Sequence, residues 1–163
     1  MADGIEIKID TTRAVAKLGR ITPEVRDNLR KVIPDLTKAL GRLIGSKLDS
    51  GLKSRKTLSV AQELHESTQM ITGVARVEAS APSPKLLPTY LNEGTRPHEI
   101  MGNPVLAFPW DKIGGRTAFF RKVNHPGFAG LHFMEAAFSE MHDEIVAEIT
   151  GAVKSGAREA DRS

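Results

Sequence analysis

The chain has 163 residues, of which 40% are hydrophobic and 26% are charged, a composition that is typical of a folded domain. A domain of this size buries about 68–70% of the surface that its unfolded chain exposes. The sequence contains no cysteine, which excludes disulfide bonds, thiolate metal sites and cysteine nucleophiles. Its net charge is only +3, and the charges are mostly interspersed, unlike the one-sided basic face of a dedicated nucleic-acid-binding domain.

Neither a secretory signal nor a membrane span is predicted. The segment Met1–Lys8 lacks the basic region and apolar core of a signal peptide. No apolar run approaches the roughly 18 residues that a transmembrane helix needs. We therefore expect a soluble protein, without a membrane partner, that is made and used in a cytoplasm.

The N-terminus is predicted to form a strand followed by a short helix. Isoleucines alternate with charged residues from Ile5 to Ile9, which indicates a strand with one buried face. Asp10 or Thr11 could cap a short helix over Thr12–Leu18.

A long helix is predicted next. Thr22 provides a capping hydroxyl, and Pro23 suits the first helical position. Apolar side chains then recur at steps of three and four residues up to about Ser50, so that they form one stripe. Pro34 lies inside this run and is expected to kink the helix, because proline removes a backbone hydrogen bond.

The middle of the chain gives weaker patterns. Residues 52–66 show no clear period, and Val60–His65 is compatible with a helical turn or with a loop. A strand is predicted over Thr68–Ala79, although apolar residues occupy both phases of its alternation. Leu86–Asn92 is a short apolar stretch, and Glu93–His98 is predicted to be a polar turn.

The C-terminal half is predicted to contain a hairpin and a second long helix. Val105–Trp110 and Thr117–Val123 have strand-like composition and are joined by a turn at Gly114–Gly115. Residues 131–153 place apolar side chains at helical spacing over roughly six turns. Residues 154–163 are small and polar, without an apolar anchor, and are predicted to be a mobile tail.

Together these elements predict the α+β class, with a mostly antiparallel sheet of about four strands packed by a long kinked N-terminal helix and a long C-terminal helix. We expect a single domain over residues 1–153. Its N-terminal strand and helices occupy residues 1–51, its sheet and loops occupy residues 68–128, and its last helix occupies residues 131–153.

Catalytic and metal-binding spacings are absent from the sequence. The histidines form no His-x-x-x-His or His-Glu-x-x-His pattern, and no phosphate-binding glycine loop or nucleophile motif is present. The fold could bring His98 and His125 together around a metal ion, but their spacing does not predict this. Carboxylates on the last helix are expected to be an ordinary solvated face: Glu140, Asp143, Glu144 and Glu148. We predict no enzyme activity, no metal and no cofactor.

Two basic clusters could contact nucleic acid. Their members are Arg42, Lys47, Lys53, Arg55 and Lys56 in the first, and Lys112, Arg116, Arg121 and Lys122 in the second. Either cluster could contact phosphate oxygens. A solvated face, or a surface that matches an acidic neighbour, is the simpler interpretation. Aromatic residues make up only 5% of the chain, fewer than a base-stacking platform usually requires.

Four motifs occur in an order that resembles a known family. They are Glu93-Gly94-Thr95 after Tyr90, then Phe108-Pro109-Trp110, then His125-Pro126-Gly127, and finally the aromatic and alanine-rich segment Phe133–Phe138. This order is similar to that of the neck, or head–tail joining, proteins of long-tailed bacteriophages, which are also described as tail components. The long amphipathic helix of the N-terminal half is a further similarity.

The resemblance implies a virion structural protein at the neck or at the head-proximal end of the tail, assembled in the host cytoplasm. The implied partners are copies of the chain in a closed ring and other head–tail connector and tail proteins. Genomic DNA passing through the channel is a possible, non-specific partner. A neck-ring subunit, a tail-completion subunit and a tail-terminating subunit are all compatible with this resemblance. The alternatives are a DNA-binding phage accessory protein that uses the basic clusters and, with the least support, a small hydrolase or metal enzyme.

The subunit contacts are predicted to lie in the loop 93–100 and the hairpin 112–122. Gly94 permits a positive φ, and Pro126 with Gly127 fixes a second turn, so both loops can hold a defined shape for a neighbour. The candidate interface residues are Glu93, Gly94, Thr95, Arg96, His98, Arg116, Arg121, His125 and Gly127.

Overall fold

The computed structural model describes residues 5–11, 22–52, 57–67, 70–80 and 86–162. Its elements are β1 (Ile5–Asp10), α2 (Pro23–Gly51), β2 (Leu58–Glu66), β3 (Ile71–Ala79), α3 (Leu87–Glu93), β4 (Gly94–Thr95), β5 (His98–Trp110), the 3-10 helix η1 (Asp111–Ile113), β6 (Arg116–His125), β7 (Phe128–Ala129) and α4 (Phe133–Ala160). The predicted α+β class, with a long helix in each half, is confirmed. The helix predicted over residues 12–18 lies outside the described residues.

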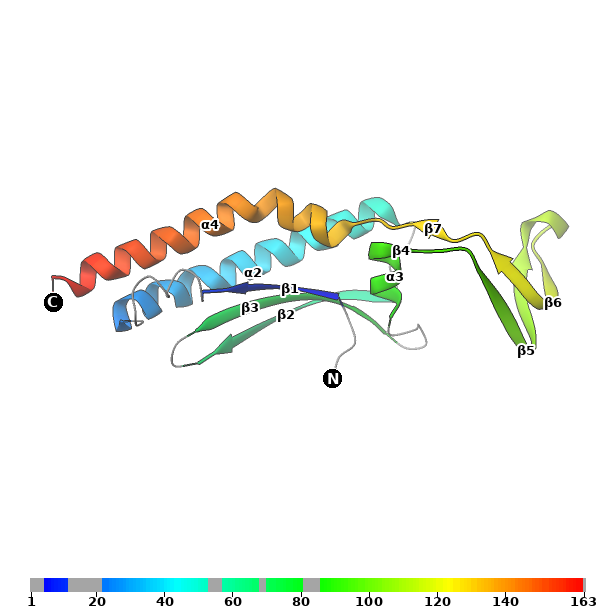
Figure 1. The fold of residues 1–163 in the computed structure, drawn as a ribbon, viewed down its shortest axis with the longest axis horizontal. Coiled ribbons are helices and arrows are strands. Elements are labelled where there is room, and N and C mark those ends of the chain that lie inside the picture. The colour runs from blue at the N-terminus through cyan, green and yellow to red at the C-terminus, as the bar shows by residue number, and fades with distance from the viewer. Residues whose placement is uncertain (1–4, 12–21, 53–56, 68–69, 81–85, 163) are drawn as a thin grey trace.

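A two-layer body holds most of the buried residues. β1 and β2 both pair antiparallel with β3, which gives the strand order β1-β3-β2. The long helices α2 and α4 lie side by side on one face of this sheet (Figure 1). We call β1, α2, β2, β3, α3 and α4 the body. The prediction of one sheet of about four strands is wrong, because β5 and β6 pair with each other and not with the body.

The apolar stripe of α2 forms the centre of the core. Thr22 caps the helix through its Oγ1, which accepts a hydrogen bond from the backbone N–H of Val25 at 3.3 Å. The fully buried apolar side chains of α2 are Val25, Leu29, Ile33, Leu40, Ile44 and Leu48. The helix continues as one element through Pro34, and the kink expected there stays a prediction.

The central strand β3 is buried on both faces, which explains why its alternation is not visible in the sequence. Gly73 faces α2, where it lies against Thr37 and Ile33. On the opposite, helix-free face Val74 is only 2% exposed. Arg76 on that face forms ion pairs with Glu6 of β1 at 2.7 Å and Glu63 of β2 at 3.6 Å. Long charged side chains therefore cover the sheet where no helix does.

Replacing Arg76 by methionine is expected to lower the free energy of unfolding by about 1–2 kcal/mol at neutral pH, more than loss of an isolated exposed ion pair would. Hydrogen bonds from Lys8 and Arg76 hold the pKa of Glu6 below its ordinary value of 4.5. This stabilisation is therefore complete above pH 4.5 and is lost as the pH falls through the lowered pKa. Urea unfolding of wild type and of Arg76→Met should show a difference in the free energy of unfolding that becomes smaller in acid. An equal difference at neutral and acid pH would show that Arg76 acts through packing alone.

Two sequence-based expectations are wrong. Residues 58–66 are a strand, not a helical turn or loop. β2 has one strand neighbour, and its second half is exposed, so that its alternation is weak. The last helix runs to Ala160, so residues 154–160 are not a mobile tail. The C-terminal end of α4 is packed through small residues, because Ala152 and Gly156 continue the buried stripe of the helix.

Candidate interaction site

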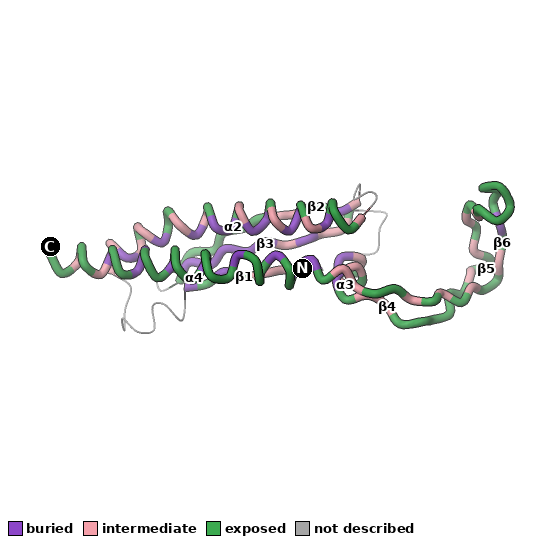
Figure 2. Tube along the Cα trace, turned by 90° about the horizontal axis from the view of Figure 1, so that it is seen from above, coloured by how far each residue is buried: buried purple, intermediate pink, exposed green. Residues whose placement is uncertain are grey.

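A two-stranded hairpin projects from the body. β5 and β6 pair antiparallel from His98 opposite His125 to Trp110 opposite Arg116. The predicted hairpin is confirmed, and its strands are longer than the sequence indicates. Figures 1 and 2 show it standing clear of the long helices and of the three-stranded sheet, beyond the end of the body where α4 begins. We call residues His98–His125 the arm.

The arm is joined to the body where two of the sequence motifs meet. Gly94 and Thr95 of β4 pair with Ala129 and Phe128 of β7. Gly94 has φ +83° and Gly127 has φ +76°, both in the region that favours glycine. A Cβ at either position would collide with the backbone of the facing segment. The Glu-Gly-Thr and His-Pro-Gly motifs thus fix the base of the arm together.

A buried asparagine connects this base to α4. Asn92, the penultimate residue of α3, is 0% exposed, and its Oδ1 accepts a hydrogen bond from the backbone N–H of Met134 at 3.0 Å. Its Nδ2 donates to both carboxylate oxygens of Glu135, each at 2.9 Å. Its backbone carbonyl accepts from the N–H of His132 at 3.0 Å. Asn92 therefore caps α4 from another element, because His132 makes no side-chain capping bond.

The two histidines at the base lie close together, with their rings tilted by 30° to each other. The ring centroids of His98 and His125 are 5.1 Å apart. Nδ1 of His98 lies 2.8 Å from the backbone carbonyl oxygen of Arg96. Because a carbonyl oxygen can only accept a hydrogen bond, Nδ1 of His98 is the ring nitrogen that carries the proton and donates. Nδ1 of His125 accepts from the N–H of Gly127 at 3.0 Å, which places the proton of the neutral ring on Nε2. A metal ion bound at Nε2 of His125 would require the ring proton to move to Nδ1, which would break the hydrogen bond from Gly127.

Aromatic side chains gather on one face of the arm. Phe108 and Phe120 stack with their ring centroids 5.6 Å apart, and Trp110 meets Phe120 edge-on at 5.3 Å. Lys112 Nζ lies 5.7 Å from the centre of the Trp110 ring. All of these contacts join residues of the arm to one another.

Other apolar side chains of the arm point into solvent. Phe119 is 66% exposed, and the exposed apolar residues of the arm also include Ile100, Met101, Val105 and Ile113. Exposed apolar groups on a projecting ribbon are characteristic of an interaction surface. Aromatic residues near a turn are visible in the sequence, but their exposure depends on the absence of a covering layer, which the sequence does not show.

The arm is also cationic. Arg116 and Arg121 are exposed and make no contact with a carboxylate in the described part of the chain. Lys122, by contrast, pairs with Glu99 at 2.9 Å. In the other basic cluster, Lys47 pairs with Glu140 of α4 at 2.6 Å. Lys53, Arg55 and Lys56 lie outside the described residues.

The nine residues predicted to form subunit contacts fall into two groups. Seven lie at or near the base of the arm: Glu93, Gly94, Thr95, Arg96, His98, His125 and Gly127. Arg116 and Arg121 lie farther out, on β6. The structure thus brings the two motif loops together but separates them from the two arginines. Sequence reasoning missed Asn92 and the exposed Phe119.

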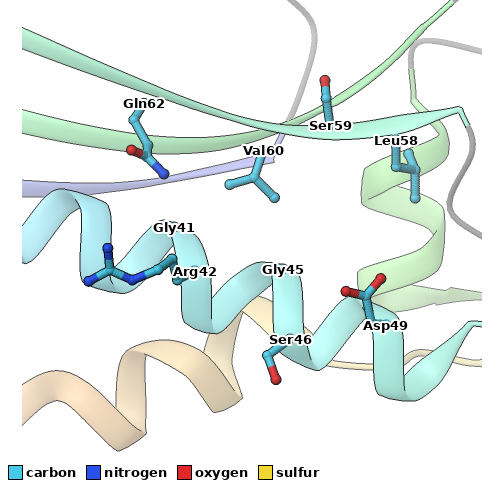
Figure 3. A pocket seen from close by; sticks show the side chains of 9 residues that line it. All are labelled: Gly41, Arg42, Gly45, Ser46, Asp49, Leu58, Ser59, Val60 and Gln62. Atoms are coloured by element: carbon cyan, nitrogen blue, oxygen red, sulfur yellow. The ribbon is translucent and has the colours of Figure 1, made fainter.

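A hollow of about 810 Å³ lies between α2 and β2 (Figure 3). Its lining residues are Gly41, Arg42, Gly45, Ser46, Asp49, Leu58, Ser59, Val60 and Gln62. This lining contains a single carboxylate, that of Asp49, and therefore no pair of carboxyl groups for acid–base catalysis. Among the described residues, no group of three or more His, Asp or Glu side chains could hold a metal ion.

Comparison with known proteins gives no match: no protein-family model fits the chain, and neither a curated protein nor a solved structure is significantly similar to it. No helix in the described ranges is long and apolar enough to cross a membrane.

Proposed function

We propose that this chain is a structural subunit of a tailed-bacteriophage virion that takes part in head–tail joining or tail completion, as a member of a homo-oligomeric ring. The observation that carries the proposal is the projecting arm, with its exposed Phe119 and Met101. An isolated two-stranded hairpin is marginally stable in water. An arm that exposes apolar side chains would therefore be stabilised by a partner protein that covers them.

The base of the arm supports the same proposal. The residues that resemble the phage family, Glu93–Thr95 and His125–Gly127, hold the arm at a fixed exit from the body. Neither loop presents an activated nucleophile or a metal-ligand set. Their chemistry suits a fixed shape that a neighbouring subunit contacts. Such contacts between different surfaces of identical chains close into rings when the rotation allows it.

The cationic ribbon supports a second candidate, binding to duplex DNA. The major groove of DNA admits a two-stranded β-ribbon, and Arg116 and Arg121 are available to phosphates. The exposed apolar side chains of the arm favour a protein partner instead. A DNA-binding function would give duplex affinity that falls steeply with salt and that depends on both arginines.

Electron microscopy of lysates tests the first proposal. In a phage whose copy of this gene carries a nonsense codon, we expect filled heads and free tails that do not join. Tails of abnormal length would place the role at tail termination. Complete, infectious particles would contradict a role in joining or completion, and duplex-binding measurements would then decide on the second candidate.

A further inference from the structure

We propose that two copies of this chain pair through the free edge of β2, so that their three-stranded sheets join into one continuous antiparallel sheet. The free edge is the side of β2 that faces away from β3. The contact is isologous, which means that both copies use the same surface and that the assembly closes on two copies. It concerns the free protein, so it goes beyond the proposed role in the virion and does not rest on it.

Two hydrogen bonds at the ends of β2 show which backbone groups point out from the free edge. The N–H of Ser80 donates to the carbonyl oxygen of Thr57 at 2.8 Å. The N–H of Ser67 donates to the carbonyl oxygen of Met70, also at 2.8 Å. Both bonds continue the register of β2 with β3, so the odd-numbered residues of β2 point their N–H and C=O groups toward β3. The even-numbered residues point these groups outward: Leu58, Val60, Gln62, Leu64 and Glu66.

This outward row of backbone groups has no partner in the described part of the chain. β3 is the one strand that pairs with β2 there, and no hydrogen bond from another described segment reaches the backbone of the five residues. Figure 1 shows β2 at the edge of the sheet, on the opposite side of β3 from β1. An unpaired edge of nine residues is a template to which another strand can add.

β2 also lacks the features that protect the other strand edges of this protein. Proteins commonly block strand addition with lysine or proline on an edge strand. β5 contains Pro104 and Pro109, β1 contains Lys8, and β6 contains two arginines and a lysine. The sequence of β2 has no proline, glycine, lysine or arginine. Of these four strands, β2 is therefore the one best suited to pair with a further strand.

The occupant that fits this edge is a second β2, because the strand is self-complementary in the antiparallel register centred on Gln62. In this register Gln62 faces Gln62 of the second copy, and Val60 faces Leu64 of the second copy. Leu64 is 51% exposed in a single copy, and the facing valine would cover it. The whole length of β2 is then paired, with two hydrogen bonds for each pair of outward residues.

The helix beside this edge leaves room for the second strand. The side chains of Val60 and Gln62 point toward α2 (Figure 3), and that of Gln62 lies against Gly41. Gly41 and Gly45 are the residues of α2 that line the hollow next to this edge without a side chain. No α2 side chain at these two positions therefore fills the space in which Leu64 of the second copy would lie.

The charges of β2 do not oppose this pairing. Glu66 forms an ion pair with Arg30 of α2 at 2.6 Å, and Glu63 lies 3.6 Å from Arg76 of β3. Each carboxylate is thus balanced by a cation of its own copy. In the register centred on Gln62, each of them also faces an apolar residue of the second copy, so that no like charges stand directly opposite.

Single-cysteine variants test the register, because the chain has no cysteine of its own. Gln62→Cys places two thiols at the two-fold axis, where the Cα atoms of a hydrogen-bonded pair lie about 5.5 Å apart, within the span of a disulfide. We expect mild oxidation to convert this variant to a covalent dimer. Ser59→Cys is the matched control on an exposed position of the same strand. Its two thiols would lie about 20 Å apart along the paired strands, so it should stay monomeric on a denaturing gel.

A proline variant tests the backbone pairing. Gln62→Pro removes an outward N–H and keeps the hydrogen bonds to β3, so the single copy should fold. Because Gln62 pairs with itself across the axis, one substitution removes two hydrogen bonds between the copies. We expect the dissociation constant of the dimer to rise by about tenfold or more. Gln62→Ala is the control, since it loses the same side chain but keeps the N–H, and it should dimerise like wild type.

Sedimentation velocity at several concentrations gives the association state, and far-ultraviolet circular dichroism verifies folding. Wild type that stays monomeric at every concentration would overturn the pairing, and so would equal association by Gln62→Pro and Gln62→Ala. Equal cross-linking of the two cysteine variants would also overturn it. If Gln62→Pro does not fold, the cysteine variants decide alone, and absence of a Gln62→Cys dimer contradicts the pairing. The nonsense phage tests the proposed function only, so the two proposals can fail separately.

Discussion

Replacing Asn92 by alanine is expected to lower the free energy of unfolding by about 2–3 kcal/mol, because a buried backbone donor loses its partner. The N–H of Met134 would remain buried without an acceptor at the first turn of α4. The carboxylate of Glu135 would lose both hydrogen bonds from Nδ2. The truncated side chain would also leave a cavity at a position that is fully buried.

Thermal and urea unfolding of Asn92→Ala measure this loss, with Asn124→Ala as the matched control. Asn124 is an exposed residue of β6, and its replacement should change stability by less than about 0.5 kcal/mol. Asn92→Asp keeps the acceptor for Met134 but sets a second carboxylate against Glu135. Its destabilisation should therefore diminish in acid, where one of the two carboxylates becomes protonated. Equal stabilities for Asn92→Ala and Asn124→Ala would contradict the capping role.

The elements that sequence alone predicted well have long periodic patterns or strong local signals. The apolar stripe and the Thr22 cap indicated α2 correctly, and Gly114 with Gly115 indicated the turn of the arm. The alternation of β1 was also visible. These signals are local: each depends on neighbours within a few residues, so that no tertiary contact is needed to interpret them.

The missed elements depend on contacts between distant residues. α3 has seven residues, too few to show a period, and its Pro88 belongs to the first turn of the helix. β2 owes its pairing to β3, and its exposed end is held by Glu66, which bonds Arg30 of α2 at 2.6 Å. Neither contact has a signature in the local sequence.

In the candidate site, too, features with a local sequence signal were predicted and features that depend on distant contacts were not. The glycines of the two motif loops were identified because positive φ is a local requirement, and both have it. That the loops pair with each other, and that Arg116 and Arg121 lie apart from them, follows from the register of β5 with β6. Phe119 is a candidate contact residue because no other part of the described structure buries its ring. A pattern of residue types does not reveal that exposure.

The last helix offers the sharpest test of packing, because two of its glycines should respond oppositely to the same change. Gly156→Ala is expected to destabilise the protein by about 1–3 kcal/mol, since the added Cβ would lie 2.5 Å from Cα of Val25 and would force α2 and α4 apart. Gly151→Ala should stabilise it by about 0.5–1 kcal/mol, because a Cβ there meets nothing within 4 Å and alanine favours the helix.

Urea unfolding of Gly156→Ala and Gly151→Ala measures whether each substitution lowers or raises the free energy of unfolding. Both substitutions bring the same gain in helix propensity, so the difference between them isolates the contact with α2. Truncation after Val153 should destabilise the protein as well, because it removes Gly156 and the last turns that pack on the start of α2. If Gly156→Ala instead stabilised the protein as much as Gly151→Ala, the C-terminal turns of α4 would not be docked, and residues 154–160 would behave as the unanchored tail that their composition suggests.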